Sequence, residues 1–120
     1  MIVAKFGGSS VANAKQLYKV KKIIESNPER KVIVVSAPGK DEHYKTKVTD
    51  LLYLTHAHVQ YGVDHHPVFN EVIERFKTIE LECGLEHNPY LDKFQRTLDK
   101  ETILDEVVAL GEKMSAMILA

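Results

Sequence analysis

The stretch KFGGSS, from Lys5 to Ser10, places a lysine, two glycines and two serines directly behind a short apolar run. Glycines at the end of a strand let the backbone approach a ligand closely, and consecutive N–H groups can then point at one anion. A lysine adds a mobile positive charge for phosphate oxygens. The stretch therefore predicts a phosphate site. The alternative is a tight strand-to-helix turn whose lysine is simply exposed, and the pattern alone leaves both open.

The elements that must position this stretch form a βαβ unit. Ile2–Phe6 is a short apolar strand, a helix is expected over Asn13–Ser26, and the β-branched run Val32–Val35 predicts a strand buried on both faces. The polar stretch from Lys40 to Lys47 is expected to be a mobile loop. Four helices should follow: one after Thr49, one from Pro67, a short one after Asn88-Pro89 and one capped by Asp99.

The expected fold class is α/β. Two parallel strands make a poor core by themselves, and the chain ends in the helical pattern Met117–Ala120 without a cap. We therefore expect residues 1–120 to be an incomplete domain, to which further strands would be added.

Composition excludes several functions. The chain has 16 Lys+Arg and 17 Asp+Glu, so its charge gives no reason to expect binding to nucleic acid or to an anionic membrane. Cys83, the single cysteine, cannot form an internal disulfide, which is typical of a cytoplasmic protein. No metal site is expected, because the six histidines lack the spacing of a zinc set and are assigned structural or surface roles.

Four motifs, in order, resemble the aspartate kinases of the amino-acid kinase superfamily. Lys5–Val11 is similar to the N-terminal signature Lys-Phe-Gly-Gly-Thr-Ser-Val, with Ser9 in place of threonine. The others are Val34-Val35-Ser36-Ala37, Val48-Thr49-Asp50-Leu51-Leu52 and Gly111-Glu112-Lys113-Met114-Ser115-Ala116. The resemblance implies that residues 1–120 are the N-terminal portion of a kinase catalytic domain, the start of a mainly parallel three-layer sandwich. By the same resemblance, the rest of the kinase domain and the regulatory ACT domains are expected to lie outside residues 1–120.

The resemblance also implies an activity. Aspartate kinases transfer the γ-phosphoryl group of ATP, carried with Mg²⁺, to the side chain of L-aspartate. The product, 4-phospho-L-aspartate, leads to lysine, methionine, threonine and diaminopimelate. On this basis ATP would be bound by Lys5, Phe6, Gly7, Gly8 and Ser9, with Lys5 also catalytic, and aspartate by Ser36, Thr49 and Glu112. The parent enzyme is expected to be a cytoplasmic homo-oligomer, and the chain alone is expected to be inactive.

Each substrate residue also has a simpler interpretation. Ser36 can cap the turn after its strand, Thr49 can be a helix N-cap, and Glu112 can be a surface residue paired with Lys113 or another neighbour. The stretch from Lys40 to Lys47 is longer than the family pattern, so Lys40, Lys45, Thr46 and Lys47 are not assigned. Two other functions remain open: a kinase for another small acid, such as acetylglutamate or glutamate, and a non-catalytic nucleotide- or effector-binding module.

Overall fold

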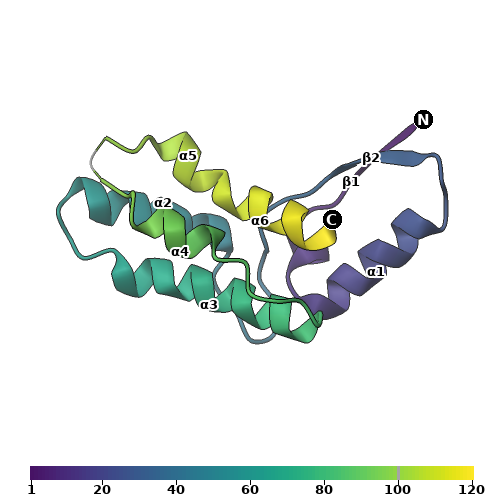
Figure 1. Cartoon of the computed structure of the whole chain (residues 1–120), viewed down its shortest axis with the longest axis horizontal. Coiled ribbons are helices and arrows are strands. Elements are labelled where there is room, and N and C mark those ends of the chain that lie inside the picture. The colour runs from purple at the N-terminus through teal and green to yellow at the C-terminus, as the bar shows by residue number, and fades with distance from the viewer. Residues whose placement is uncertain (100) are drawn as a thin grey trace.

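The computed structural model describes residues 1–99 and 101–120. Two parallel strands and one helix form one end of the molecule, and a group of helices forms the other (Figure 1). The elements in chain order are β1 (Ile2–Lys5), the 3₁₀ turn η1 (Gly8–Val11), α1 (Ala14–Glu25), β2 (Arg30–Val34), α2 (Val48–Gln60), α3 (His66–Glu82), α4 (Tyr90–Gln95), α5 (Leu104–Val108) and α6 (Leu110–Leu119).

The predicted βαβ unit is confirmed. β1 and β2 pair in parallel, with Lys5 opposite Val34, and the Phe6 N–H extends the pairing by donating to the Val34 carbonyl at 2.9 Å. The Asn13 side chain caps α1, since its oxygen accepts the Gln16 N–H at 3.0 Å. The helical spacing predicts one apolar face of α1 with Leu17, Val20, Ile23 and Ile24. Leu17 and Val20 are buried in the core and Ile24 packs against it, but Ile23 is 44% exposed.

The prediction that the second strand is buried on both faces is wrong for this chain. Val32 and Val34 are 41% and 43% exposed, and Val3, which pairs with Val32, is 59% exposed. On the opposite face, Ala4 and Ile33 pack against the core. β-Branched residues favour a pleated strand whether or not the chain covers both of its faces. A run of such residues therefore predicts the strand but not which of its faces is buried.

The main core lies among the helices that follow the βαβ unit, where α2 contacts α3, α5 and α6. The apolar spacing of these helices predicted most of its members. The core side chains that are no more than 1% exposed include Val48, Leu52, Phe69, Val72, Phe76, Leu91, Val107, Leu110 and Met114.

The prediction of the last helix is wrong in two respects: where the helix starts, and that it is one continuous helix. Asp99 does not cap it, because its carboxylate accepts the N–H groups of Glu101 and Thr102 and closes a separate turn. The chain then forms two short helices, α5 and α6, which meet at Ala109.

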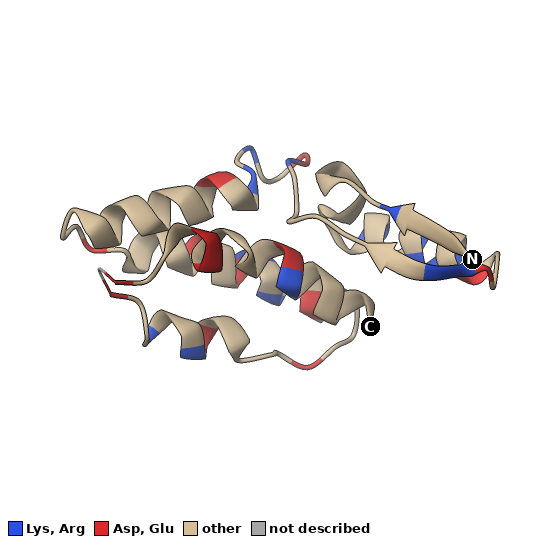
Figure 2. Ribbon diagram, turned by 90° about the horizontal axis from the view of Figure 1, so that it is seen from above, with Lys and Arg blue, Asp and Glu red and all other residues tan. Residues whose placement is uncertain are grey.

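Charged residues of both signs are interspersed along the helices (Figure 2). Within the described residues, no helix combines the length and the hydrophobicity needed to cross a bilayer.

One buried carboxylate fixes the connection between α3 and α4. Glu80 is 3% exposed, and its Oε2 accepts the Asn88 N–H at 2.6 Å. The other oxygen, Oε1, lies 3.2 Å from His87 Nδ1, and His87 Nε2 lies 2.6 Å from Asp92 Oδ2. The hydrogen bond to Asp92, together with the one to Glu80, raises the pKa of His87 above its ordinary value.

We therefore expect His87 to make stability depend on pH. Because its pKa is raised in the folded state, the stabilisation is complete below the unfolded pKa of about 6.5 and is lost as the pH rises through the folded pKa. Urea unfolding of the wild-type protein and of His87→Gln, from about pH 5.5 to 9, measures this difference. Identical pH curves for the two proteins would show that the His87 contacts do not contribute.

Gly111 gives a second prediction. A Cβ at this position would lie 2.4 Å from Ala37 Cβ and 3.3 Å from Val48 Cγ1. Overpacking costs about 1–3 kcal/mol, whereas the better helix propensity of alanine returns at most about 1 kcal/mol. Gly111→Ala should therefore lower the free energy of unfolding, measured in urea.

Gly7→Ala is the matched control, because nothing lies within 4 Å of an added Cβ and its φ of −75° suits any residue. We expect this variant to unfold like the wild type. Equal stability of Gly111→Ala and Gly7→Ala would contradict the close packing of α6 on Ala37.

Candidate functional site

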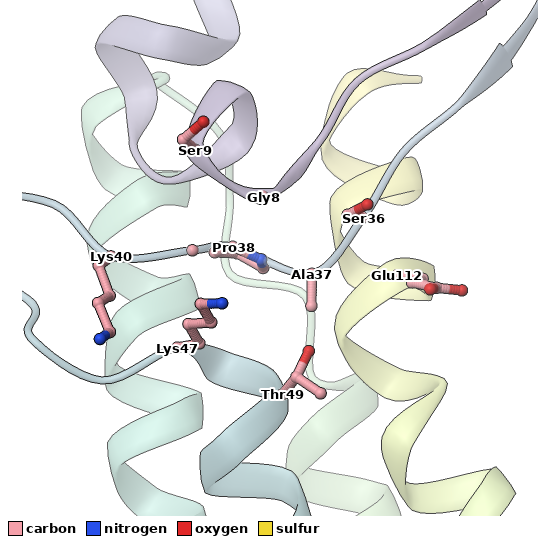
Figure 3. A pocket seen from close by; sticks show the side chains of 10 residues that line it. Gly8, Ser9, Ser36, Ala37, Pro38, Lys40, Lys47, Thr49 and Glu112 are labelled. Carbon is pink, nitrogen blue, oxygen red and sulfur yellow. The ribbon is translucent and has the colours of Figure 1, made fainter.

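A cavity of about 490 Å³ opens at the carboxyl end of the strand pair, where the loop after β2, η1 and the first turns of α2 and α6 meet (Figure 3). Ligands in open α/β sheets bind at this edge. The residues that line the cavity are Gly8, Ser9, Ser36, Ala37, Pro38, Gly39, Lys40, Lys47, Thr49 and Glu112.

The cavity brings together residues that the sequence analysis selected from four separate motifs. Gly8 and Ser9 come from η1, Ser36 follows β2, Thr49 lies in the first turn of α2, and Glu112 lies in the first turn of α6. These positions are up to about a hundred residues apart in the chain, and they line one space.

The first part of the glycine stretch lies outside the cavity lining. Phe6 is 9% exposed and belongs to the core, and Gly7 precedes η1. Lys5 is exposed at the end of β1, where it pairs with Val34. Because residues paired across neighbouring strands point to the same face of a sheet, Lys5 stands on the same side as Val34, two residues before Ser36. Lys5 therefore lies at the sheet edge where the cavity opens.

Two glycines let the loops after β1 and β2 touch. The Gly39 N–H donates to the Gly8 carbonyl at 2.9 Å. A Cβ on Gly39 would lie 2.9 Å from the Gly8 carbonyl carbon, and one on Gly8 would lie 3.1 Å from the Ala37 oxygen. Gly8 is therefore needed for packing as well as for any approach of a ligand, and Gly39 is a site residue that the sequence analysis missed.

The start of α2 excludes one interpretation of Thr49. The residue before the helix is Lys47, which makes no side-chain cap, and the Val48 N–H donates to the Pro38 carbonyl at 3.1 Å. Thr49 is thus not the N-cap, and its half-buried side chain borders the cavity. Glu112 is exposed, and in the described part of the chain it forms no ion pair with Lys113.

Charge is unevenly distributed around the cavity. Lys40 and Lys47 lie on one side of it, whereas Ser36 and Glu112 lie on the other (Figure 3). The two lysines were not assigned from the sequence, although the place of Lys40 directly after the Pro38-Gly39 turn at the end of a strand was a usable signal. The cationic side suits an anionic group, and the Glu112 side suits an ammonium group.

The loop between Gly39 and Lys47 is anchored rather than free. Asp41 Oδ1 accepts the N–H groups of His43 and Tyr44 at 2.9 and 2.7 Å, and its Oδ2 accepts the Asn13 side-chain amide at 3.0 Å. Burial raises the pKa of Asp41, but these hydrogen bonds and the nearby Arg75 charge outweigh it, so the pKa lies below its ordinary value. The carboxylate is therefore held ionised inside the loop.

Arg75 of α3 is the second anchor, and the sequence analysis did not find it. Its side chain is 1% exposed and lies beside the apolar stripe of α3. Nη1 donates to the Thr46 carbonyl at 3.1 Å, and Nη2 donates to the carbonyls of Ala12, at 3.2 Å, and Gly39. The guanidinium also stacks on the Tyr44 ring, 4.7 Å from its centroid.

Among the described residues, no group of three or more histidine, cysteine or acidic side chains could hold a metal ion. Of the described residues that line the cavity, Glu112 alone is acidic. The described residues around the cavity could therefore bind a small anion and a cation-bearing group, but they do not form a metal cage.

The fold and the cavity define an α/β protein whose candidate site lies at the carboxyl ends of parallel strands, beside a glycine-rich turn. The chain belongs to the amino acid kinase family, whose family model matches residues 1–120.

Two relatives cover the whole chain. Aspartokinase 3 of Bacillus subtilis (strain 168) is 42% identical over an alignment of 130 residues. The crystal structure of Clostridium acetobutylicum aspartate kinase is 39% identical, with a TM-score of 0.92 over 100% of this chain. The chain spans 28% of the length of each of them.

A more distant structure shares the fold. Escherichia coli aspartokinase III, crystallised with aspartate and ADP, has a TM-score of 0.74 at 21% identity, over 99% of this chain and 28% of that chain. At this level of identity the likeness shows the fold alone.

Proposed function

We propose that residues 1–120 are the N-terminal portion of the catalytic domain of an aspartate kinase. The enzyme would transfer the γ-phosphoryl group of ATP to the side-chain carboxylate of L-aspartate. The observation that carries this proposal is the single cavity lined by Gly8, Ser9, Ser36, Thr49 and Glu112, which come from four motifs of the aspartate kinase pattern. The whole-chain identity of 42% to an aspartokinase supports it.

Phosphoryl transfer to a carboxylate requires positioning of the substrates and neutralisation of charge rather than a general base. A carboxylate with a pKa of about 4 is already ionised at neutral pH, so no residue has to remove a proton from the nucleophile. The obstacle is the repulsion between this anion and the phosphates. We assign the offsetting charge to Lys5, with Lys40 and Lys47 on the cationic side of the cavity.

The substrate side of the site would be formed by Ser36, Thr49 and Glu112. The exposed carboxylate of Glu112 would attract the α-ammonium group of aspartate, directly or through neighbouring groups. Thr49, in the first turn of α2, lies near helix N–H groups that favour a carboxylate. Phe6, Gly7, Gly8 and Ser9 would support or contact the phosphates.

Mg²⁺ fits this arrangement as a companion of the nucleotide. Magnesium usually keeps several water ligands and binds substrate phosphates, and Glu112, the one carboxylate among the described lining residues, is assigned to the amino acid, so the ion would be held by the phosphates and water. The ion would reduce the negative charge on the phosphates. As further parts of the proposal, the parent enzyme is a cytoplasmic homo-oligomer that opens the route to lysine, methionine and threonine.

A panel of acceptors tests the proposal. The full-length enzyme should phosphorylate L-aspartate in the presence of ATP and Mg²⁺. The reaction is measured by the release of ADP and by trapping the acyl phosphate with hydroxylamine. A preference for glutamate or N-acetylglutamate would show that the enzyme is an amino acid kinase with a different substrate. Binding of ATP without turnover of any acid would indicate a non-catalytic module.

Lys5→Ala should lower kcat by about 10²–10³-fold, the usual effect of removing one charge-stabilising donor from a transition state. Its side chain is exposed, so folding should be unaffected. Lys31→Ala is the matched control. Lys31 is also an exposed strand lysine, but it lies near the amino end of β2, away from the carboxyl ends of the strands where the cavity opens. Near-normal turnover with Lys5→Ala in the full-length enzyme would remove Lys5 from the mechanism.

Glu112→Gln should raise the KM for aspartate at least about tenfold while leaving the KM for ATP nearly unchanged, because a charged hydrogen bond is worth about 1.5–3 kcal/mol. Initial-rate kinetics with each substrate varied in turn measure the two constants. Glu106→Gln, an exposed acid on α5 outside the cavity, is the control. Equal increases in both KM values would argue against contact with the amino acid.

A further inference from the structure

The three carbonyls bound by Arg75 belong to three separate backbone segments, and each segment borders the cavity. Ala12 directly follows η1, which carries Gly8 and Ser9. Gly39 directly precedes Lys40, and Thr46 directly precedes Lys47. One guanidinium therefore holds the glycine turn and both ends of the loop that carries the cationic side of the site.

The loop is also closed at its base. The Val48 N–H donates to the Pro38 carbonyl at 3.1 Å, and the Gly39 N–H donates to the Gly8 carbonyl. Inside this closure, the Arg75 guanidinium stacks on Tyr44, whose N–H donates to Asp41. These contacts restrain the backbone between Gly39 and Thr46.

Burying the charged guanidinium of Arg75 costs desolvation free energy, so packing alone does not account for an arginine at this position. It is 1% exposed, and in the described part of the chain no carboxylate forms an ion pair with it. Its Nε has no hydrogen-bond partner there. Burial lowers its pKa, and the opposing effects of nearby Asp41 and Tyr44 are smaller, so the charge is only partly compensated. A well-packed apolar residue would usually be no less stabilising than such a group.

We propose that Arg75 is a positioning residue of the phosphoryl-transfer site. By binding the carbonyls of Ala12, Gly39 and Thr46 at once, it fixes Lys40 and Lys47 opposite Glu112. The kinetic part of this inference rests on the proposed function, whereas the anchoring of the loop does not.

The loop itself supplies a readout that is independent of activity. Lys40, Lys45 and Lys47 are exposed, so trypsin can cut this segment only when its backbone leaves the anchored arrangement. In Arg75→Lys the charge remains, but one ammonium group cannot span both ends of the loop as the planar guanidinium does. We expect native-state cleavage after these lysines to be about tenfold faster in Arg75→Lys than in the wild type.

The matched control is Val72→Ala on the same helix. Val72 is completely buried in the core, so its truncation destabilises α3 without removing a hydrogen bond from the loop. Measured in the full-length protein at a temperature where both variants are folded, Val72→Ala should leave loop cleavage and kcat/KM near the wild-type values. Arg75→Lys should lower kcat/KM about tenfold, and Arg75→Met should lower it further.

Tyr44→Leu guards against a failure of the Arg75 variants to fold. It removes the ring on which the guanidinium stacks but keeps the three carbonyl bonds, so it should show the same two effects in smaller measure. Wild-type cleavage rates in both Arg75→Lys and Tyr44→Leu would overturn the anchoring. Faster cleavage with an unchanged kcat/KM would overturn the positioning role. Faster cleavage in an enzyme that phosphorylates a different acid would leave the anchoring intact and overturn only the proposed substrate.

Discussion

A buried guanidinium bound to three carbonyls is the contact on which the candidate site depends. Arg75 reaches from α3 to the backbone at Ala12, Gly39 and Thr46, and these positions adjoin the segments that line the cavity. Backbone carbonyls are strong acceptors that must be satisfied when buried, so the arginine and the loops require one another. The helical body thereby fixes loops that emerge from the strand pair, and a site can form where no single element could hold it.

Close backbone contacts complete this arrangement. Gly39 packs directly on the backbone of Gly8, and Gly111 packs on the small side chain of Ala37, so the glycine turn, the loop after β2 and α6 approach one another closely. The glycines that a phosphate site would use are therefore also packing residues. The resulting cavity has lysines on one side and Glu112 on the other. This polarity matches the proposed reaction, in which phosphates and an amino acid must be brought together against their mutual repulsion.

Most of the fold could be predicted from the sequence, because turn residues and apolar spacing act over a few positions. The predicted helix begins where expected, with Asn13 as the cap of α1, and apolar side chains of α2 and α3 are buried. The errors share a cause. The exposed face of Val32 and Val34 depends on what covers the sheet, and the turn at Asp99 depends on competition between a cap and a local hydrogen-bonded turn. A short sequence pattern predicts neither outcome.

The sequence by itself determined the βαβ start and predicted a phosphate site at the glycine stretch, and the resemblance of its motifs selected Ser36, Thr49 and Glu112. Only the tertiary structure showed that these three residues share a cavity and that Lys40 and Lys47 belong to it. It alone revealed Arg75 as the anchor. The bond from Arg75 to Gly39 joins positions 36 residues apart, and a contact between distant segments leaves no periodic trace along the chain.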